Sequence, residues 1–368
     1  MKHISRFTAI ALLFALGCRK HGDPTSSTTD VSGPFNEAEL ARFSALSPID
    51  THTHFYGKAP AFATMLQKLN LHVVDILVAH TPEQKDLDVE RDQALAFIQS
   101  SGGRAVLATT FNPFPYAQPK FSQNTFASLN QDFDKGAIAV KIWKNIGEQV
   151  KNAKGGYVLP DDPVWEPIYQ DIAAHDKTLI AHVADPNTIW EAPDKNAADY
   201  SYYTEHPEWY MYGRANAPSK EAILQARDRM LAKNPQLRVV GAHLGSMEAD
   251  FNQIADRLDK YPNFAIDLAA RMPYIVAQPR ADIIRFITKY QDRLIYATDD
   301  ELAASENPAD VATKLEASYA LDWRYFATSD SLVYRHHAIQ GLALPEPILR
   351  KLYHDNAVKW FPGVVATK

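Results

Sequence analysis

The sequence predicts an α/β protein built as a (β/α)8 barrel, and three observations lead to this fold class. From Phe35 onward, short apolar runs rich in Val, Ile, Leu and Ala alternate with amphipathic segments, which is typical of strands buried on both faces and of the helices that cover them. The apolar runs recur about every 35 residues, as strand-plus-helix units do. Eight such units form a barrel of about 250 residues, and the chain of 368 residues has room for it.

The expected elements follow in order along the chain. An N-terminal helix is expected near residues 35–46, before the first strand. Between the strands, the spacing of Val164, Ile168 and Ile172 places three apolar side chains on one face of a helix. The eight expected strands occupy residues 48–52, 73–78, 104–109, 137–143, 178–183, 238–243, 263–268 and 293–297.

Two insertions lengthen the barrel, and both are rich in aromatic residues. The first insertion (185–218) follows the fifth strand, and the second insertion (300–342) follows the eighth. Both therefore belong to the rim at the carboxyl ends of the strands, where active sites of this fold lie. Their aromatic side chains either cover a pocket or pack in loops and oligomer contacts, and both interpretations stay open. They are Trp190, Tyr200, Tyr202, Tyr203, Trp209, Tyr210 and Tyr212 in the first insertion, and Tyr319, Trp323, Tyr325 and Phe326 in the second.

Composition and charge exclude several classes of protein. Hydrophobic residues make up 46% and charged residues 22% of the chain, which excludes a disordered chain and allows a large buried core. Lys and Arg number 38 against 44 Asp and Glu, for a net charge of −6, and this balance argues against a nucleic-acid binder. The single cysteine, Cys18, excludes an intrachain disulfide and a cysteine-based zinc site.

Residues 1–17 are expected to be a bacterial secretory signal of the lipoprotein type. Lys2 and Arg6 precede an apolar run that is about half as long as a membrane-spanning helix. The stretch ALGC that ends at Cys18 resembles a lipobox, in which the cysteine becomes the lipidated N-terminus. The alternative is an ordinary signal peptide with an incidental cysteine.

The expected mature chain consists of an anchor, a tether and one domain. Acylation of Cys18 would hold the chain at a membrane surface without spanning the bilayer. Residues 18–34 contain a run of Ser and Thr and no aromatic residue, which predicts a flexible tether. Residues 35–368 then form the barrel domain. We therefore expect an exported lipoprotein at the periplasmic face of a membrane, with the outer membrane as our choice.

Polar side chains stand at the ends of several expected strands. His52 and His54 end the first strand, and alternation in an extended segment places both on one face. His182 ends the fifth strand, His243 ends the sixth, and Asp299 follows the eighth. Because the carboxyl ends of barrel strands meet at the catalytic face, these five side chains are expected to converge. A pair of imidazoles on one face can bind one metal ion.

This set of strand-end residues resembles the amidohydrolase superfamily, over nearly all of residues 48–362. It is most similar to the amidohydrolase-related branch of metal-dependent TIM barrels, which includes aminocarboxymuconate-semialdehyde decarboxylase, aromatic acid decarboxylases and lactone hydrolases. Residues 356–361 are similar to the terminal helix of that branch. The resemblance implies that His243 is a catalytic or supporting histidine and that a divalent metal, usually zinc, is bound by four ligands. The implied ligands are His52, His54, His182 and Asp299, the last chosen over Asp300 because the family's Thr-Asp pattern aligns with Thr298-Asp299.

The residue types suit the chemistry that the resemblance implies. Neutral imidazoles and a carboxylate suit Zn²⁺, and Mn²⁺ accepts similar ligands. A bound metal lowers the pKa of water toward about 7. Asp299 can accept the proton of that water as a general base, and His243 can polarise a substrate carbonyl or protonate a leaving group.

Lys141 ends the fourth strand and allows three interpretations. A cationic lysine can bind a substrate carboxylate or phosphate. Some amidohydrolases instead carboxylate a lysine at this strand end, which would bring a second metal. The third interpretation is a structural ion pair. After the seventh strand, Asp267 and Arg271 are further candidates for substrate contact or for an ion pair at the rim. Of the other histidines, His80 is the main exception to a structural or surface role.

The sequence therefore predicts an enzyme with a small-molecule substrate. We expect a metal-dependent hydrolase that uses activated water on a lactone, an amide or a related carbonyl compound. The alternative is a metal-dependent nonoxidative decarboxylase of unsaturated or aromatic carboxylic acids, although several such enzymes have a glutamate where this chain has His52. A surface lipoprotein without enzymatic activity is the third hypothesis. The substrate, the number of metals and the oligomeric state, including a homo-oligomer, stay open.

Overall fold

The computed structural model describes residues 33–197, 200–302, 305–334 and 337–365. The expected signal segment 1–17, Cys18 and all but the end of the expected tether lie outside these ranges. Among the described helices, none has both the length and the apolar character that crossing a membrane requires.

Eight parallel strands form the barrel that the sequence predicts. Each strand pairs in parallel with the next strand in the chain, from β1 to β8. All eight expected strands are confirmed, with ends that differ by a few residues. They are β1 (Ile49–Phe55), β2 (His72–Ile76), β3 (Ala105–Thr110), β4 (Ala139–Ile142), β5 (Thr178–Ala181), β6 (Arg238–Gly241), β7 (Phe264–Asp267) and β8 (Leu294–Ile295).

The barrel closes through the segment that follows β8. A short strand, β9 (Asp300–Leu302), pairs in parallel with β1. Between β8 and β9, the Thr51 N–H donates to the Tyr296 carbonyl at 3.2 Å, and the Asp299 N–H donates to the His52 carbonyl at 2.8 Å. β8 and β9 therefore act as one interrupted strand. This closure places Asp299 beside the histidines of β1.

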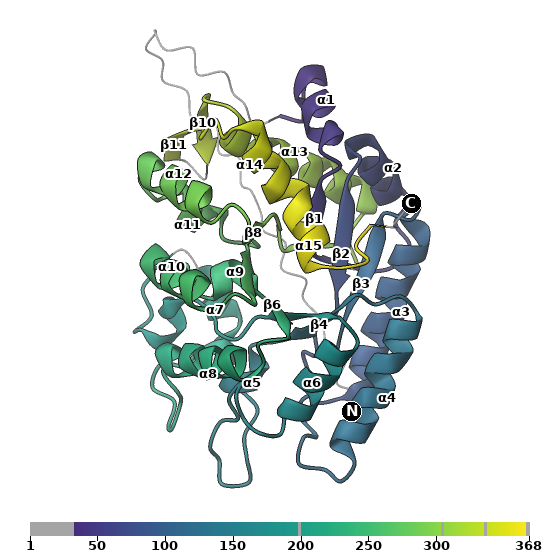
Figure 1. Ribbon diagram of the computed structural model, residues 1–368, viewed down its shortest axis with the longest axis vertical. Helices are drawn as coiled ribbons and strands as arrows, with labels where there is room; N and C mark the ends of the chain where they lie inside the picture. The colour runs from purple at the N-terminus through teal and green to yellow at the C-terminus, as the bar shows by residue number, and fades with distance from the viewer. Residues whose placement is uncertain (1–32, 198–199, 303–304, 335–336, 366–368) are drawn as a thin grey trace.

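Each barrel strand is followed by a helix, and the helices surround the sheet (Figure 1). In the view of Figure 1, α3 and α4 lie on one side of the strands, and α10 and α12 lie on the opposite side. The expected N-terminal helix is confirmed as α1 (Glu37–Ala45), which begins with a capping box between Asn36 and Glu39. The eight covering helices are α2 (Pro60–Leu69), α3 (Gln84–Ser100), α4 (Phe121–Asp134), α6 (Glu166–Ala174), α8 (Lys220–Lys233), α10 (Phe251–Lys260), α12 (Arg280–Lys289) and α13 (Pro308–Ala327).

The strands are apolar because packed atoms cover both of their faces. Every residue of β4, β5 and β7 is buried. Ile49, Val74 and Ile180 belong to one cluster that alternate strand positions contribute, and Trp360 and Phe361 pack against it. Trp360 lies in α15 (Asn356–Trp360), whose last turn meets the start of β5. The C-terminal helix therefore closes the amino-terminal end of the barrel, opposite the expected site.

The two insertions use their aromatic residues differently. The first insertion contains η1 (Asn187–Trp190), α7 (Tyr200–Glu205) and η2 (Pro207–Trp209), and a small core of Ile189, Tyr203, Trp209 and Met211 holds it together. In the second insertion, the four aromatic residues lie on α13 and are at most 3% exposed. Trp323 packs against Phe43 of α1. Packing, rather than a covered pocket, therefore accounts for the aromatic residues of the second insertion.

The remaining elements are short. A hairpin of β10 (Ser331–Tyr334) and β11 (His337–Gln340) follows α13. The other short helices are α5 (Asn145–Glu148), α9 (Ala242–Gly245), α11 (Met272–Val276), α14 (Glu346–Arg350) and η3 (Lys351–Asp355).

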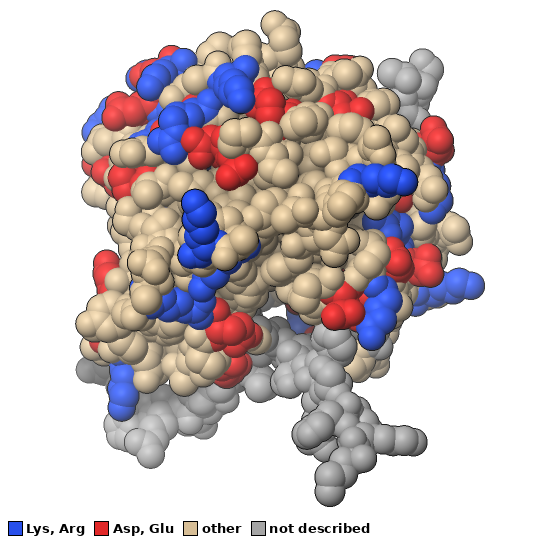
Figure 2. Space-filling view, turned by 90° about the horizontal axis from the view of Figure 1, so that it is seen from below, with Lys and Arg blue, Asp and Glu red and all other residues tan. Residues whose placement is uncertain are grey.

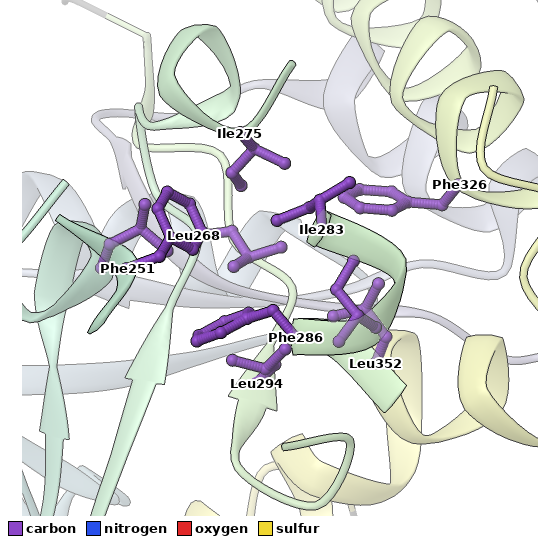
Figure 3. A pocket seen from close by; sticks show the side chains of 10 residues that line it. Phe251, Leu268, Ile275, Ile283, Phe286, Leu294, Phe326 and Leu352 are labelled. Carbon is purple, nitrogen blue, oxygen red and sulfur yellow. The ribbon is translucent and has the colours of Figure 1, made fainter. Parts of the chain in front are cut away.

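One face of the surface and one internal cavity bear on where a ligand binds. On the face shown in Figure 2, acidic and basic side chains are interspersed around a broad uncharged area. The cavity in Figure 3 has a volume of about 10 Å³ and is lined by apolar side chains, including Phe251, Phe286 and Phe326. A cavity the size of one water molecule with no polar partner stays dry. It is therefore a gap in helix packing and not a substrate site.

Candidate active site

His52, His54 and Asp299 meet at the carboxyl end of the barrel strands. The two histidines lie in β1, and Asp299 immediately precedes β9. The Oδ1 atom of Asp299 lies 3.2 Å from His52 Nε2 and 3.4 Å from His54 Nε2. All three ligand atoms lie within 4.8 Å of one another, and no other His, Cys, Asp or Glu trio in the described residues meets this condition. We call these three residues the metal centre.

The second ring nitrogen of each histidine is taken by a protein acceptor. His54 Nδ1 donates to the Ile76 carbonyl at 2.8 Å, and His52 Nδ1 lies 2.9 Å from Asp267 Oδ2. Because a carbonyl oxygen only accepts, the proton of a neutral His54 sits on Nδ1 and its Nε2 keeps a lone pair. Metal-binding histidines are normally held in this way. Two imidazoles and a carboxylate so arranged fit a divalent cation.

Asp267 is buried and contacts His52. Its Oδ1 atom accepts the backbone N–H of His243 at 2.7 Å and that of Ala269 at 3.2 Å, and its side chain is 2% exposed. The two backbone N–H groups occupy Oδ1, so Oδ2 is left to accept the Nδ1–H of His52. Asp267 therefore orients His52 through an ion-pair contact, which is the second of the two roles expected for it, and its contact with a substrate stays a prediction.

Lys141 is buried beside His52. Its Nζ lies 2.8 Å from His52 Nε2, the nitrogen that faces Asp299. Burial lowers the pKa of Lys141 to about 8, although Asp299 and Asp267 act to raise it. The described part of the chain offers its ammonium no carboxylate within 4.0 Å, unlike a structural ion pair. A metal ion and the Lys141 amine therefore compete for one lone pair.

His182 and His243 face each other next to the metal centre. His182 Nδ1 lies 3.2 Å from His243 Nε2, while His182 Nε2 lies 3.3 Å from Asp185 Oδ1 and His243 Nδ1 lies 3.0 Å from the Ala269 carbonyl. Burial lowers the pKa of both rings, to about 3 for His182, so each neutral ring carries one N–H. Both outer partners are acceptors, which draws the N–H groups outward and leaves two lone pairs facing each other. His182 thus faces His243 and lies outside the three-ligand group, and its role as the fourth metal ligand stays a prediction.

Two residues of the site have a left-handed backbone. The φ angle is 59° at His243 and 70° at Asp299, and the next three residues after His243, through Ser246, continue with φ between 56° and 63°. Such a conformation costs about 1–2 kcal/mol for each non-glycine residue and is concentrated at functional sites. The fully buried Arg227 guanidinium donates to the Gly245 carbonyl and supports the turn.

Asp299, and not Asp300, joins the metal centre. The surrounding imidazoles, against the effect of burial, hold the pKa of Asp299 well below its ordinary value. Burial instead raises the pKa of Asp300 to about 8. The Asp300 N–H donates to Thr298 Oγ1 at 3.2 Å. Asp299 is therefore the ionised carboxylate of the pair, as the Thr-Asp pattern implies.

The other candidate residues lie around the metal centre. Arg271 Nε lies 3.8 Å from Glu248 Oε2, and Lys220 donates to Glu248 Oε1 at 2.7 Å. Arg271 therefore has the ion-pair partner that one expectation gave it, and its contact with a substrate stays a prediction. His80 stacks against Trp143 with 4.9 Å between the ring centroids, outside the metal centre.

Sequence reasoning missed two buried charged residues beside His182. Lys144 and Asp185 are 2% and 3% exposed, and Lys144 Nζ lies 2.5 Å from Asp185 Oδ2. Both residues follow a barrel strand within a few positions, Lys144 after β4 and Asp185 after β5. The signal that selected the histidines, a polar residue just after a barrel strand, therefore applies to Lys144 and Asp185 as well.

The barrel and the metal centre define a metal-dependent enzyme of the (β/α)8 class. A family model described as amidohydrolase matches residues 144–363, which is more than half of the chain. The protein belongs to the amidohydrolase family, as the strand-end residues predicted, and it is an enzyme of that family. No curated protein sequence matches the chain.

Several solved structures share the fold. A 2,6-dihydroxybenzoate decarboxylase from Rhizobium is 13% identical, with a TM-score of 0.51, and the match covers 85% of this chain and 98% of that one. A 2,6-dihydroxybenzoate decarboxylase complexed with 2,6-dihydroxybenzoate is 14% identical, with a TM-score of 0.50 and the same coverage of 85% and 98%. At these identities the likeness concerns the fold.

Proposed function

We propose that this enzyme is a metal-dependent hydrolase that acts on a small lactone, an amide or a related carbonyl compound. One observation carries the proposal. Two imidazole Nε2 atoms face one carboxylate oxygen at 3.2 and 3.4 Å, while the Nδ1 atoms of both rings are held by a carboxylate and a carbonyl. This geometry prepares three lone-pair donors at the catalytic end of the barrel.

His52, His54 and Asp299 would hold the ion, with His182 as the expected fourth ligand. Zn²⁺ is our first choice for the ion and Mn²⁺ the second. A divalent cation supplies Lewis acidity there and lowers the pKa of water toward about 7. Asp299 directs Oδ1 toward the two imidazoles, and its Oδ2 lies 4.0 Å from His243 Nδ1. The Oδ2 atom is thus placed to accept a proton from the attacking water as a general base.

His243 acts through Nε2. Because its Nδ1–H donates to the Ala269 carbonyl, the neutral ring presents an unprotonated Nε2 toward His182. At that atom His243 accepts a proton or binds a cation. Donating a proton to a leaving group therefore requires that His243 first gain one, which burial opposes by lowering its pKa.

Lys141 and the facing histidines decide the number of ions. If His52 Nε2 held an ion, the Lys141 amine would lose its contact with that nitrogen and could bind an anionic group of the substrate. Two lone pairs 3.2 Å apart repel each other unless a cation lies between them. The pair of His182 and His243 therefore supports a second ion in the case that Lys141 is carboxylated.

Activity measurements with and without metal test the reaction. Metal-free protein should lose turnover on a panel of lactones and amides, and Zn²⁺ or Mn²⁺ should restore it. His52→Ala should abolish turnover, whereas His175→Ala, at a partly exposed histidine outside the site, should not. Turnover that persists without metal would contradict the proposal. Release of carbon dioxide from carboxylic acids, without hydrolysis, would favour the decarboxylase alternative.

We also propose that the enzyme is exported and anchored through a lipidated Cys18. The support is the order of a charged segment, a short apolar run and the ALGC stretch at the start of the chain. The anchor would leave the barrel outside the cytoplasm, joined to the membrane surface by residues 18–34. Its oligomeric state stays a prediction.

A further inference from the structure

Asp185 is fixed at three points beside the metal centre. Its Oδ2 accepts from Lys144 Nζ at 2.5 Å, its Oδ1 lies 3.3 Å from His182 Nε2, and its backbone N–H donates to Glu148 Oε1 at 3.0 Å. Lys144 and His182 thus contact the two oxygen atoms of the Asp185 carboxylate, one each.

The contact with Asp185 sets the orientation of His182. A carboxylate that accepts the outer N–H of a histidine fixes the tautomer of the ring. It also makes the inner nitrogen a stronger electron-pair donor to a metal ion. Here the inner nitrogen is His182 Nδ1, which faces His243 Nε2 at 3.2 Å. The proposed reaction gives no role to the buried Lys144 and Asp185 beside His182.

Lys144 joins this carboxylate to the first insertion. Its Nζ lies 4.1 Å from the centroid of the Trp209 ring and 5.5 Å from that of Tyr202, and both rings belong to the first insertion. Trp143, at the end of β4, contributes a third ring at 5.2 Å. The ring face attracts a desolvated ammonium electrostatically. One ammonium thus contacts both the orienting carboxylate and the aromatic residues of the insertion.

We propose that Lys144 and Asp185 are positioning residues that hold His182 toward His243 and couple this orientation to the seating of the first insertion at Trp209. The inference rests on the metal centre of the proposed function and does not depend on the reaction. Displacement of the insertion would move Lys144, release Asp185 and turn His182 away from His243. Conversely, binding of a cation at His182 would change the environment of the Trp209 ring.

Zn²⁺ binding to the full domain tests the positioning role. Asp185→Asn and Lys144→Met should weaken Zn²⁺ binding about 10–100-fold, as loss of a residue that orients a ligand does. Lys151→Met is the matched control, because Lys151 also lies over an aromatic ring, that of Tyr157 at 4.6 Å, but contacts no residue of the site. Binding by both site variants within about 2-fold of the wild type would overturn the proposal.

The coupling to the insertion needs a variant that touches no ligand. Trp209→Leu should also weaken Zn²⁺ binding, whereas Trp190→Leu should not, because Trp190 belongs to the same insertion and donates to the Pro218 carbonyl instead of contacting Lys144. Subtraction of Trp209→Phe spectra from those of the wild type isolates the Trp209 emission, which should change when Zn²⁺ is added. Equal affinities of the two leucine variants, or an unchanged Trp209 emission, would overturn the coupling.

Further measurements distinguish a loss of metal binding from misfolding and from failure of the proposed reaction. Near-ultraviolet circular dichroism selects the folded variants, and Asp185→Asn, which keeps the side-chain volume, decides the positioning role if Lys144→Met does not fold. A wild-type chain that binds no Zn²⁺ would overturn both this inference and the metal centre. A chain that binds Zn²⁺ with the expected order of affinities but hydrolyses none of the substrates would overturn the proposed reaction alone.

Discussion

At the scale of single residues, the site depends on which nitrogen of each histidine carries the proton. Ile76 and Asp267 accept from the Nδ1 atoms of His54 and His52, so that both Nε2 atoms remain donors toward a cation. The Ala269 carbonyl likewise accepts the Nδ1–H of His243, which leaves Nε2 of that ring unprotonated. A backbone carbonyl or a buried carboxylate thus selects the tautomer at each of the three rings.

Asp267→Asn tests this selection. The amide would keep one oxygen for the backbone N–H groups but would present an NH₂ group to His52 Nδ1, which favours the opposite tautomer and puts the proton on Nε2. We expect Zn²⁺ affinity to fall about 10–100-fold, measured by competition with a chelating dye. Asp259→Asn, in an exposed ion pair with Lys289, is the control. Unchanged affinity in Asp267→Asn would contradict the assignment of the tautomer.

Lys141→Met tests the competition at His52. Removal of the amine that lies 2.8 Å from His52 Nε2 should tighten the binding of a single ion, because nothing else then occupies that lone pair. Metal content by mass spectrometry should be one ion per chain in the wild type and in the variant. A wild type with two ions and a variant with one would show instead that Lys141 is carboxylated and bridges them.

The sequence predicted the metal centre but not the orientation of His182. The residues His52, His54 and Asp299 could be found because strand ends meet at one face of a barrel, whatever the loops do. The ring of His182 is turned by Asp185, whose ionisation depends on Lys144 from another strand end. Such a contact joins positions that no local periodicity connects, and only the folded chain brings it together.

At the scale of elements, the left-handed turn after β6 requires a glycine before it. A Cβ atom at Gly241 would lie 2.6 Å from Phe264 Cζ and 2.8 Å from the backbone of Gly245. The strand sequence could be predicted from its apolar run, but this close approach could not, because it depends on the packing of β7 against the turn. This left-handed segment also determines the position of His243.

Gly241→Ala should therefore be destabilising. Overpacking of this kind costs about 1–3 kcal/mol, and the displacement of Phe264 and Gly245 should also move His243. The free energy of unfolding in urea measures the change. Gly33→Ala, where a Cβ would meet no atom within 4 Å, is the control and should differ little from the wild type. Equal stability of both variants would contradict the packing around the turn.

A buried acid in α13 gives the fold a pH dependence. Burial raises the pKa of Asp322 to about 7, although the hydrogen bond from Tyr296 at 2.9 Å lowers it. The folded state thus retains a proton that the unfolded state loses near pH 4. The stabilisation from this proton is complete below pH 4 and is lost as the pH rises through 7, by about 1.4 kcal/mol for each unit of pKa difference.

Asp322→Asn removes this titration, because the amide cannot ionise. The free energy of unfolding of the variant should therefore rise relative to that of the wild type between pH 5 and pH 7.5. Urea unfolding at the two pH values measures the difference. A difference that stays constant, or that moves in favour of the wild type as the pH rises, would contradict the buried neutral acid.

At the scale of the whole molecule, α13 holds the first of the described residues in place. Arg324 donates to the carbonyls of Gly33 and Pro34 at 2.7 and 2.8 Å and to both carboxylate oxygens of Glu39. Composition predicts a tether over residues 18–34, but it could not predict the contact of Gly33 and Pro34 with α13. If extended, the segment between Cys18 and Gly33 would span about 50 Å.

Cys18→Ser tests the anchor. The wild type, expressed with its full N-terminal segment, should partition with the membrane fraction and into a detergent phase because of its acyl chains. The variant lacks the thiol that receives the lipid and should be found without it in the aqueous phase. A wild type that stays in the aqueous phase would favour the ordinary signal peptide.

The metal centre itself is tested most directly by an anomalous-scattering map of crystals grown with Zn²⁺. The account predicts a peak about 2.0–2.2 Å from His52 Nε2, His54 Nε2 and an oxygen of Asp299, with Lys141 displaced from His52. A second peak between His182 and His243 would accompany carboxylation of Lys141. A fully Zn²⁺-loaded crystal with no peak at His52, His54 and Asp299 would contradict the account.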